Sequence, residues 1–66
     1  MTKKYIVIIK HKEEIIGRQM FDNLTNVKAS VDLVEQWNPE YEFEIFKIAK
    51  LAKYMNVTIK EALKIL

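Results

Sequence analysis

The stretch QWNPEYEFEIFKI, residues 36–48, decides the fold, because two secondary structures fit it. Its Asn38-Pro39 pair is typical of the cap and first turn of a helix. From residue 41 to residue 45, however, apolar and acidic side chains alternate, which is the pattern of a strand with one buried face. The choice between the two structures determines how the rest of the chain can pack.

A helix over residues 39–55 would leave three aromatic side chains on a face that also carries lysines, and it would bring Glu44 into the apolar stripe. A strand over residues 41–47 leaves only Phe46 facing the wrong way. The side chains that this strand directs inward are Tyr41, Phe43 and Ile45. We therefore predict the strand, and we keep the helix as an alternative that would give a β-hairpin followed by three helices.

The residues before this stretch predict a hairpin and a helix. Residues 5–9, YIVII, form a β-branched run that is apolar on both alternating faces, as in a central strand. A charged cluster at residues 11–14 predicts a turn into a second strand over residues 15–21, in which Gly17 indicates a bulge or a close backbone approach. Apolar residues spaced three and four apart then predict a helix over residues 24–37.

The residues after the stretch predict two short helices. Ile48, Leu51, Ala52 and Met55 share one helical face. Thr58 followed by Glu61 three positions later is a capping box, and it predicts a final helix that runs to the end of the chain.

The resulting order, β-β-α-β-α-α, predicts one small α+β domain over residues 1–66. A right-handed crossover through the first helix places the third strand beside the first, which gives an antiparallel sheet in the order 2-1-3. One face of the central strand then takes the helix of residues 24–37. The other face needs the C-terminal helix pair or a partner.

Composition restricts the class of protein. The chain has 66 residues, half of them apolar, and it contains no cysteine, so we expect neither a disulfide framework nor a structural zinc site. Its N-terminus holds too short an apolar run for a signal peptide, and no stretch approaches the ~20 apolar residues of a membrane span. We expect a cytoplasmic protein without a membrane partner. Basic, acidic and basic blocks follow one another along the chain, and we expect folding to interleave them.

The residues needed for catalysis are scarce. The only histidine is His11, the only serine is Ser30, and a single glycine excludes a glycine-rich phosphate loop. We therefore expect no enzyme, no cofactor, no metal site and no small-molecule substrate. Glu42 and Glu44 are interpreted as edge charges that discourage strand pairing. Trp37 is interpreted as an anchor of the core rather than as a platform for a ligand.

The last 19 residues, IAKLAKYMNVTIKEALKIL, resemble the helix-turn-helix of bacterial transcription regulators. The resemblance rests on small, turn and inward-facing positions, namely Ala52, Asn56, Val57, Thr58, Ala62 and Ile65. It implies that residues 48–66 would bind DNA, with contacts to nucleic acid from Lys50, Lys53, Thr58, Lys60, Glu61 and Lys64. The alternative is an ordinary corner of two helices that closes the sheet.

The pattern as a whole favours a non-catalytic intracellular module for protein interaction or regulation. Small size and a composition rich in lysine and isoleucine suggest an accessory protein of a phage or mobile element. A chain this short has little core, so we expect it to bind a protein partner or to form a homodimer. The candidate interface residues are Phe46, Ile65 and Leu66. Nucleic acid is the alternative partner.

Overall fold

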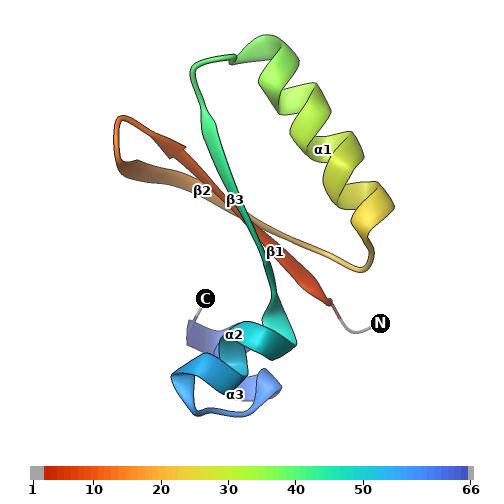
Figure 1. Cartoon of the computed structure of the whole chain (residues 1–66), viewed down its shortest axis with the longest axis vertical. Coiled ribbons are helices and arrows are strands. Elements are labelled where there is room, and N and C mark those ends of the chain that lie inside the picture. Colours follow the sequence, from red (N-terminus) through yellow and green to blue (C-terminus); the bar gives the residue numbers. More distant parts are fainter. Residues whose placement is uncertain (1–2, 66) are drawn as a thin grey trace.

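The computed structural model describes residues 3–65, which form three strands and three helices (Figure 1). In chain order these are β1 Tyr5–His11, β2 Glu14–Phe21, α1 Leu24–Trp37, β3 Glu42–Lys47, α2 Ile48–Met55 and α3 Ile59–Ile65. The strands form an antiparallel sheet in the order β2-β1-β3, with β1 in the centre. The predicted α+β class and strand order are confirmed.

The stretch that decides the fold is extended, as predicted. β3 begins at Glu42, one residue later than expected, and pairs with β1 along its whole length. The N–H of Ile48 donates to the carbonyl oxygen of Lys4 at 2.9 Å, so the pairing continues into the first residue of α2. A continuous helix over residues 39–55 is therefore wrong for this chain, and β3 passes directly into α2.

The β1–β2 hairpin has a tight turn and one bulge. Lys12 and Glu13 form a two-residue loop in which both φ angles are positive, 52° and 68°, as a type I′ turn requires. Further along, Ile9 pairs with Gly17 but Lys10 pairs with Ile15, so one extra residue lies in β2. The bulge that Gly17 indicated is thus confirmed.

Helix α1 covers one face of the sheet. Its N-terminus is capped by Asn23, whose side-chain oxygen accepts a hydrogen bond from the N–H of Asn26 at 2.9 Å. Val27 is fully buried on the side of the helix that faces the sheet. The hydroxyl of Ser30 donates to the side-chain oxygen of Gln19 in β2 at 3.0 Å. Gln19 pairs with the buried Val7 of β1, so this is the face that carries Val7.

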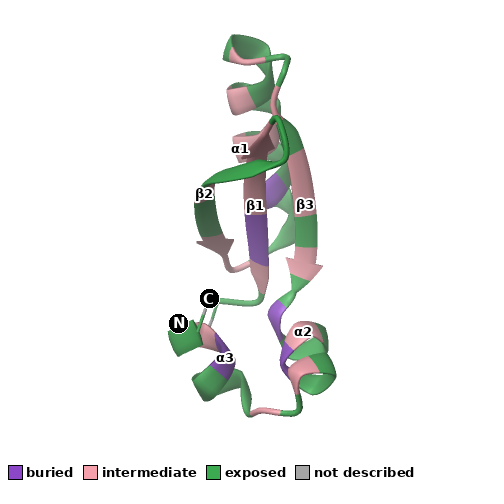
Figure 2. Cartoon of the chain, turned by 90° about the vertical axis from the view of Figure 1, so that its left-hand side faces the viewer, coloured by how far each residue is buried: buried purple, intermediate pink, exposed green. Residues whose placement is uncertain are grey.

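The helix pair α2–α3 covers the opposite face, but only at one end of the sheet (Figures 1 and 2). There Ile6 of β1 packs in one buried cluster with Ile48, Ala52 and Ala62. Phe46, which the strand pattern left facing the wrong way, points to this cluster and is partly buried against it. Helices therefore lie on both faces of the sheet, although Ile45 of β3, on the α1 face, remains 46% exposed.

The molecule is thin, with principal dimensions of 35 × 25 × 15 Å. Among residues 3–65 only six hydrophobic residues are buried, and they lie in β1, α1, α2 and α3 (Figure 2). The same residues expose nine large hydrophobic side chains. The core therefore leaves much of the chain's apolar surface in contact with solvent.

Trp37 is the clearest error of the sequence interpretation. It was expected to anchor the core, but its side chain is 76% exposed. The stripe of α1 that faces the sheet runs through Val27, and Trp37 lies on the flank that also carries Leu33 and Ser30. Trp37 is also the last residue of α1, and its side chain is left uncovered at that end of the helix.

Candidate functional site

The turn between α2 and α3 is built by a residue in the left-handed conformation. Asn56 has φ 60° and ψ 42°, and its N–H donates to the carbonyl oxygen of Lys53 at 3.1 Å. The N–H of Val57 donates to the carbonyl oxygen of Ala52 at 3.0 Å. These two bonds form a Schellman motif, which ends α2 and turns the chain back. Asparagine here takes the place of the glycine that is more usual at this position.

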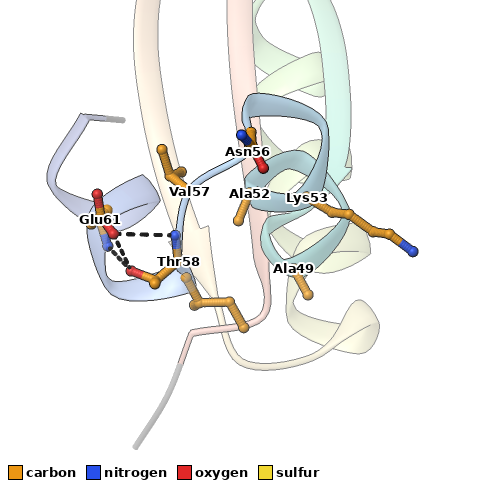
Figure 3. Close-up of a pocket in the computed structure, with 8 residues that line it drawn as sticks. Ala49, Ala52, Lys53, Asn56, Val57, Thr58 and Glu61 are labelled. Carbon is orange, nitrogen blue, oxygen red and sulfur yellow. Dashed lines mark hydrogen bonds between the residues drawn. The ribbon is translucent and has the colours of Figure 1, made fainter.

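Helix α3 begins with the predicted capping box (Figure 3). The hydroxyl oxygen of Thr58 accepts a hydrogen bond from the N–H of Glu61 at 3.1 Å, and the hydroxyl donates to the Glu61 carboxylate at 3.0 Å. The same carboxylate accepts from the N–H of Thr58 at 3.5 Å. Both side chains thus hold the helix start, and their polar atoms are already engaged.

A groove of about 480 Å³ lies between α2 and α3. Ala49 and Ala52 line its α2 side, and Thr58 and Glu61 line its α3 side. Lys53 also borders the groove, but its side chain extends away from it (Figure 3). The groove presents small apolar groups and a carboxylate that is already hydrogen bonded, so it offers little to an anion.

The structure separates the residues predicted to contact nucleic acid. All of them are exposed. Lys53, Thr58 and Glu61 border the groove between the helices, whereas Lys50 borders a different groove beside β3. Lys60 and Lys64 lie four residues apart on α3 and line neither groove. The predicted contacts therefore do not share one groove.

The second groove, which we call the β3–α2 groove, has a volume of about 660 Å³. Its lining is mainly apolar with two lysines, from Ile45, Phe46, Lys47, Lys50, Leu51 and Tyr54. Tyr54 is 88% exposed and Ile45 is 46% exposed. Within residues 3–65, no lysine from position 47 onward forms an ion pair with a carboxylate. The groove thus combines apolar side chains with two cations that are available to an acidic partner.

The predicted interface residues occupy different positions. Phe46 has one side against the core cluster and another in the β3–α2 groove. Ile65 is 62% exposed at the end of α3. Leu66 lies outside the described residues.

Sequence reasoning missed Ile45 and Tyr54 as members of this groove. Ile45 was expected to face inward, and it does lie on the α1 face of the sheet, but α1 lies toward β2 and leaves this edge uncovered. The spacing of Lys50 and Tyr54, four residues apart, was the signal that could have placed both on one face of α2.

Ion pairs lie near opposite ends of β1. Lys10 of β1 forms an ion pair with Glu44 of β3, and a hydrogen bond from Lys10 to this carboxylate raises the pKa of the lysine. The Nζ atom of Lys3 lies 3.5 Å from the Oδ1 atom of Asp22. The basic start of the chain is thus interleaved with the acidic middle block, as expected.

His11 does not lie in the turn that the sequence predicted for residues 11–14. It is the last residue of β1, half-buried, and its ring lies against Tyr41 with the centroids 5.4 Å apart. No group of three or more His, Cys, Asp or Glu side chains within residues 3–65 could hold a metal ion.

Comparison with known proteins gives no relative. No protein-family model matches the chain, and neither the curated proteins nor the solved structures contain a match. Among the described residues, none of the helices has the length and apolar character needed to cross a bilayer. The fold defines the class, a small α+β domain with a three-stranded antiparallel sheet.

Proposed function

We propose that this chain is a non-catalytic interaction domain that acts by associating with a protein, in the first place with another copy of itself. The observation that carries the proposal is the imbalance between buried and exposed apolar residues. Six hydrophobic residues are buried within the described chain, while nine large ones are exposed. Trp37 and Tyr54 are the most exposed of these.

The physical reason is the size of the domain. A chain of about 60 residues buries only about 60% of its unfolded surface, and its stability margin is correspondingly small. Small domains without disulfides or metals commonly gain stability from association. Apolar side chains that gather at one place, as Ile45, Phe46 and Tyr54 do around the β3–α2 groove, are also typical of protein interfaces.

The test is a measurement of mass in solution. We expect light scattering coupled to size exclusion to give a mass above that of the 7.9 kDa monomer, rising with concentration from the micromolar to the millimolar range. A monomer mass throughout, together with no partner recovered in a pull-down from host lysate, would contradict the proposal.

A second candidate function is binding to duplex DNA through residues 48–66. The observation that favours it is the α2–turn–α3 geometry together with the exposed lysines Lys50, Lys53, Lys60 and Lys64. Against it, α3 has seven residues and is only about 10 Å long, which is short for a helix that must read the major groove.

Salt dependence tests the second candidate. Binding to DNA predicts an affinity that falls with salt at a log–log slope of about −0.9 for each phosphate neutralised. K60A and K64A should each reduce that slope by about one unit, whereas K28A, at an exposed lysine of α1, should leave it unchanged. An absence of binding at low salt would remove this function.

A further inference from the structure

We propose that two copies of this chain form a two-fold homodimer through β3, with the β3 strands paired antiparallel and Ile45 on the two-fold axis. The two three-stranded sheets would then form one continuous sheet. This inference rests on the proposed function, and it deepens it by naming the partner, the edge and the register.

The pairing would use the outer edge of β3. Within residues 3–65, β3 has β1 on one side and no strand on the other. The bond from the N–H of Ile48 to the carbonyl oxygen of Lys4 fixes which residues bond to β1, because such bonds alternate along an antiparallel pair. The N–H and C=O groups of Phe43, Ile45 and Lys47 consequently point outward and can pair with another strand.

A groove lies beside that edge. The β3–α2 groove, about 660 Å³, opens alongside β3 and is bordered by Ile45 and Lys47 from the strand and by Lys50 and Tyr54 from α2. Ile45 is on the α1 face of the sheet, and its exposure shows that α1 does not block this edge. A second strand can therefore approach β3 from outside.

The side chains that would face each other favour one register. When a strand pairs with its own copy across a two-fold axis, the residue on the axis determines the whole register. Residues that face each other then lie on the same face of the sheet, so few registers use the outward groups of β3. Centring the axis on Glu44 would place two carboxylates directly opposite each other, which is destabilising. Centring it on Ile45 places Ile45 against its own copy and Phe43 against Lys47 of the second copy, an aromatic–cation pair.

The distribution of charge also favours antiparallel pairing of two copies. Glu40 and Glu42 lie just before and at the start of β3, and Lys47 and Lys50 lie at its end and in the first turn of α2. Antiparallel pairing brings the acidic end of each strand beside the basic end of the other. In the register centred on Ile45, Glu42 of the second copy lies at the start of α2, next to the β3–α2 groove that Lys50 borders.

Glu44 does not prevent this pairing. It was interpreted as a charge that discourages strand pairing, but it forms an ion pair with Lys10 of its own chain. In the register centred on Ile45 it lies opposite Phe46 of the second copy, away from its own symmetry mate.

The experiment uses the position on the axis, because a residue there meets itself. Each of I45K and I45E should lose the dimer, with the mass by light scattering reduced by half, since like charges would face each other. An equimolar mixture of the two should recover it as a heterodimer. I16K is the matched control: Ile16 is 47% exposed on the other edge strand, β2, and its substitution should leave the dimer intact.

A second measurement tests the geometry directly. The chain contains no cysteine, so I45C introduces a unique thiol. Directly paired residues in an antiparallel ladder have Cα atoms about 5.5 Å apart, within the range that a disulfide spans. Oxidation should therefore convert I45C to a covalent dimer and leave I16C monomeric on a denaturing gel. Far-UV circular dichroism checks that all variants remain folded.

The outcomes separate the two proposals. If the wild-type chain is a dimer but I45K and I45E remain dimeric, or if I16K abolishes the dimer, the β3 interface is overturned and self-association stands. A monomeric wild-type chain would overturn the proposal that a second copy binds the β3 edge. A lysate protein that binds the wild-type monomer and not I45K would then identify a different occupant.

Discussion

Lys12 and Glu13 hold the hairpin turn in a conformation that neither side chain favours. Both residues have positive φ angles, and each non-glycine residue in the left-handed region costs about 1–2 kcal/mol. The type I′ turn prefers Asn-Gly at these positions. We expect the double variant K12N/E13G to raise the free energy of unfolding by about 1–2 kcal/mol, measured by urea denaturation at one fixed protein concentration. An unchanged or lower free energy would show that the loop is not strained.

A lone glycine in a strand usually marks a position that no other residue can occupy, but Gly17 does not. Its φ is not positive, and a Cβ atom built there would lie 3.6 Å from the Cδ1 atom of Ile9, an ordinary contact. G17A should therefore stabilise the domain by about 0.5–1 kcal/mol, because glycine loses more conformational freedom on folding. Thermal and urea unfolding provide the measurement. A destabilised G17A would mean that the bulge needs glycine after all.

The Lys10–Glu44 pair gives a pH dependence with a definite sign. Hydrogen bonding to Glu44 raises the pKa of Lys10 above its ordinary value of 10.5, so the stabilisation is fully present below pH 10.5 and is lost as the pH rises through the raised pKa. E44Q should lower the pKa of Lys10 toward 10.5 in an NMR titration. E42Q should lower it less, because Glu42 acts only through a weaker Coulombic interaction. Equal effects of the two variants would contradict the assignment of Glu44 as the main partner.

At the scale of elements, the short helix α3 depends on its two ends. Asn56 adopts the left-handed conformation that closes α2, and the Thr58 hydroxyl caps α3. We expect N56A and T58A each to lower the free energy of unfolding by about 1 kcal/mol, through left-handed strain in the first and a lost cap in the second. N56G is the matched control and should be neutral or stabilising, because glycine adopts this conformation freely. If N56G were as unstable as N56A, the asparagine side chain itself would be required.

The elements were predictable from the sequence to a large extent. The alternation around Glu42 and Glu44, the apolar spacing over residues 24–37 and the Thr58–Glu61 box are local patterns, and each determined its element to within a residue or two. The left-handed turn at Asn56 was also local. Patterns of this kind are readable because backbone periodicity imposes them on neighbouring residues.

What could not be predicted is where each element lies on the sheet. The exposure of Trp37 and Ile45 depends on the lateral position of α1 toward β2, which is set by contacts such as that between Ser30 and Gln19. The β3–α2 groove likewise depends on α2 following β3 at one end of the sheet. Such placements arise from packing between distant segments, and no spacing within one segment encodes them.

At the scale of the whole molecule, Trp37 reports which surface association uses. It is the only tryptophan, and it belongs to α1 rather than to the β3 edge. We expect red-shifted emission that acrylamide quenches efficiently, at both low and high protein concentration. A blue shift or reduced quenching on self-association would place α1 in the interface instead of β3.

Neighbouring residues Ile6 and Val7 serve the two opposite faces of the sheet, the first against α2 and α3 and the second against α1. The apolar layer between the sheet and α1 and the apolar layer between the sheet and the α2–α3 pair are therefore connected through adjacent residues of β1. Neither layer can open without disturbing the strand that supports the other. Deuterium uptake at the amides of this strand should be the slowest in the chain, and protection should vanish from both layers in the same denaturant range, as one cooperative unit.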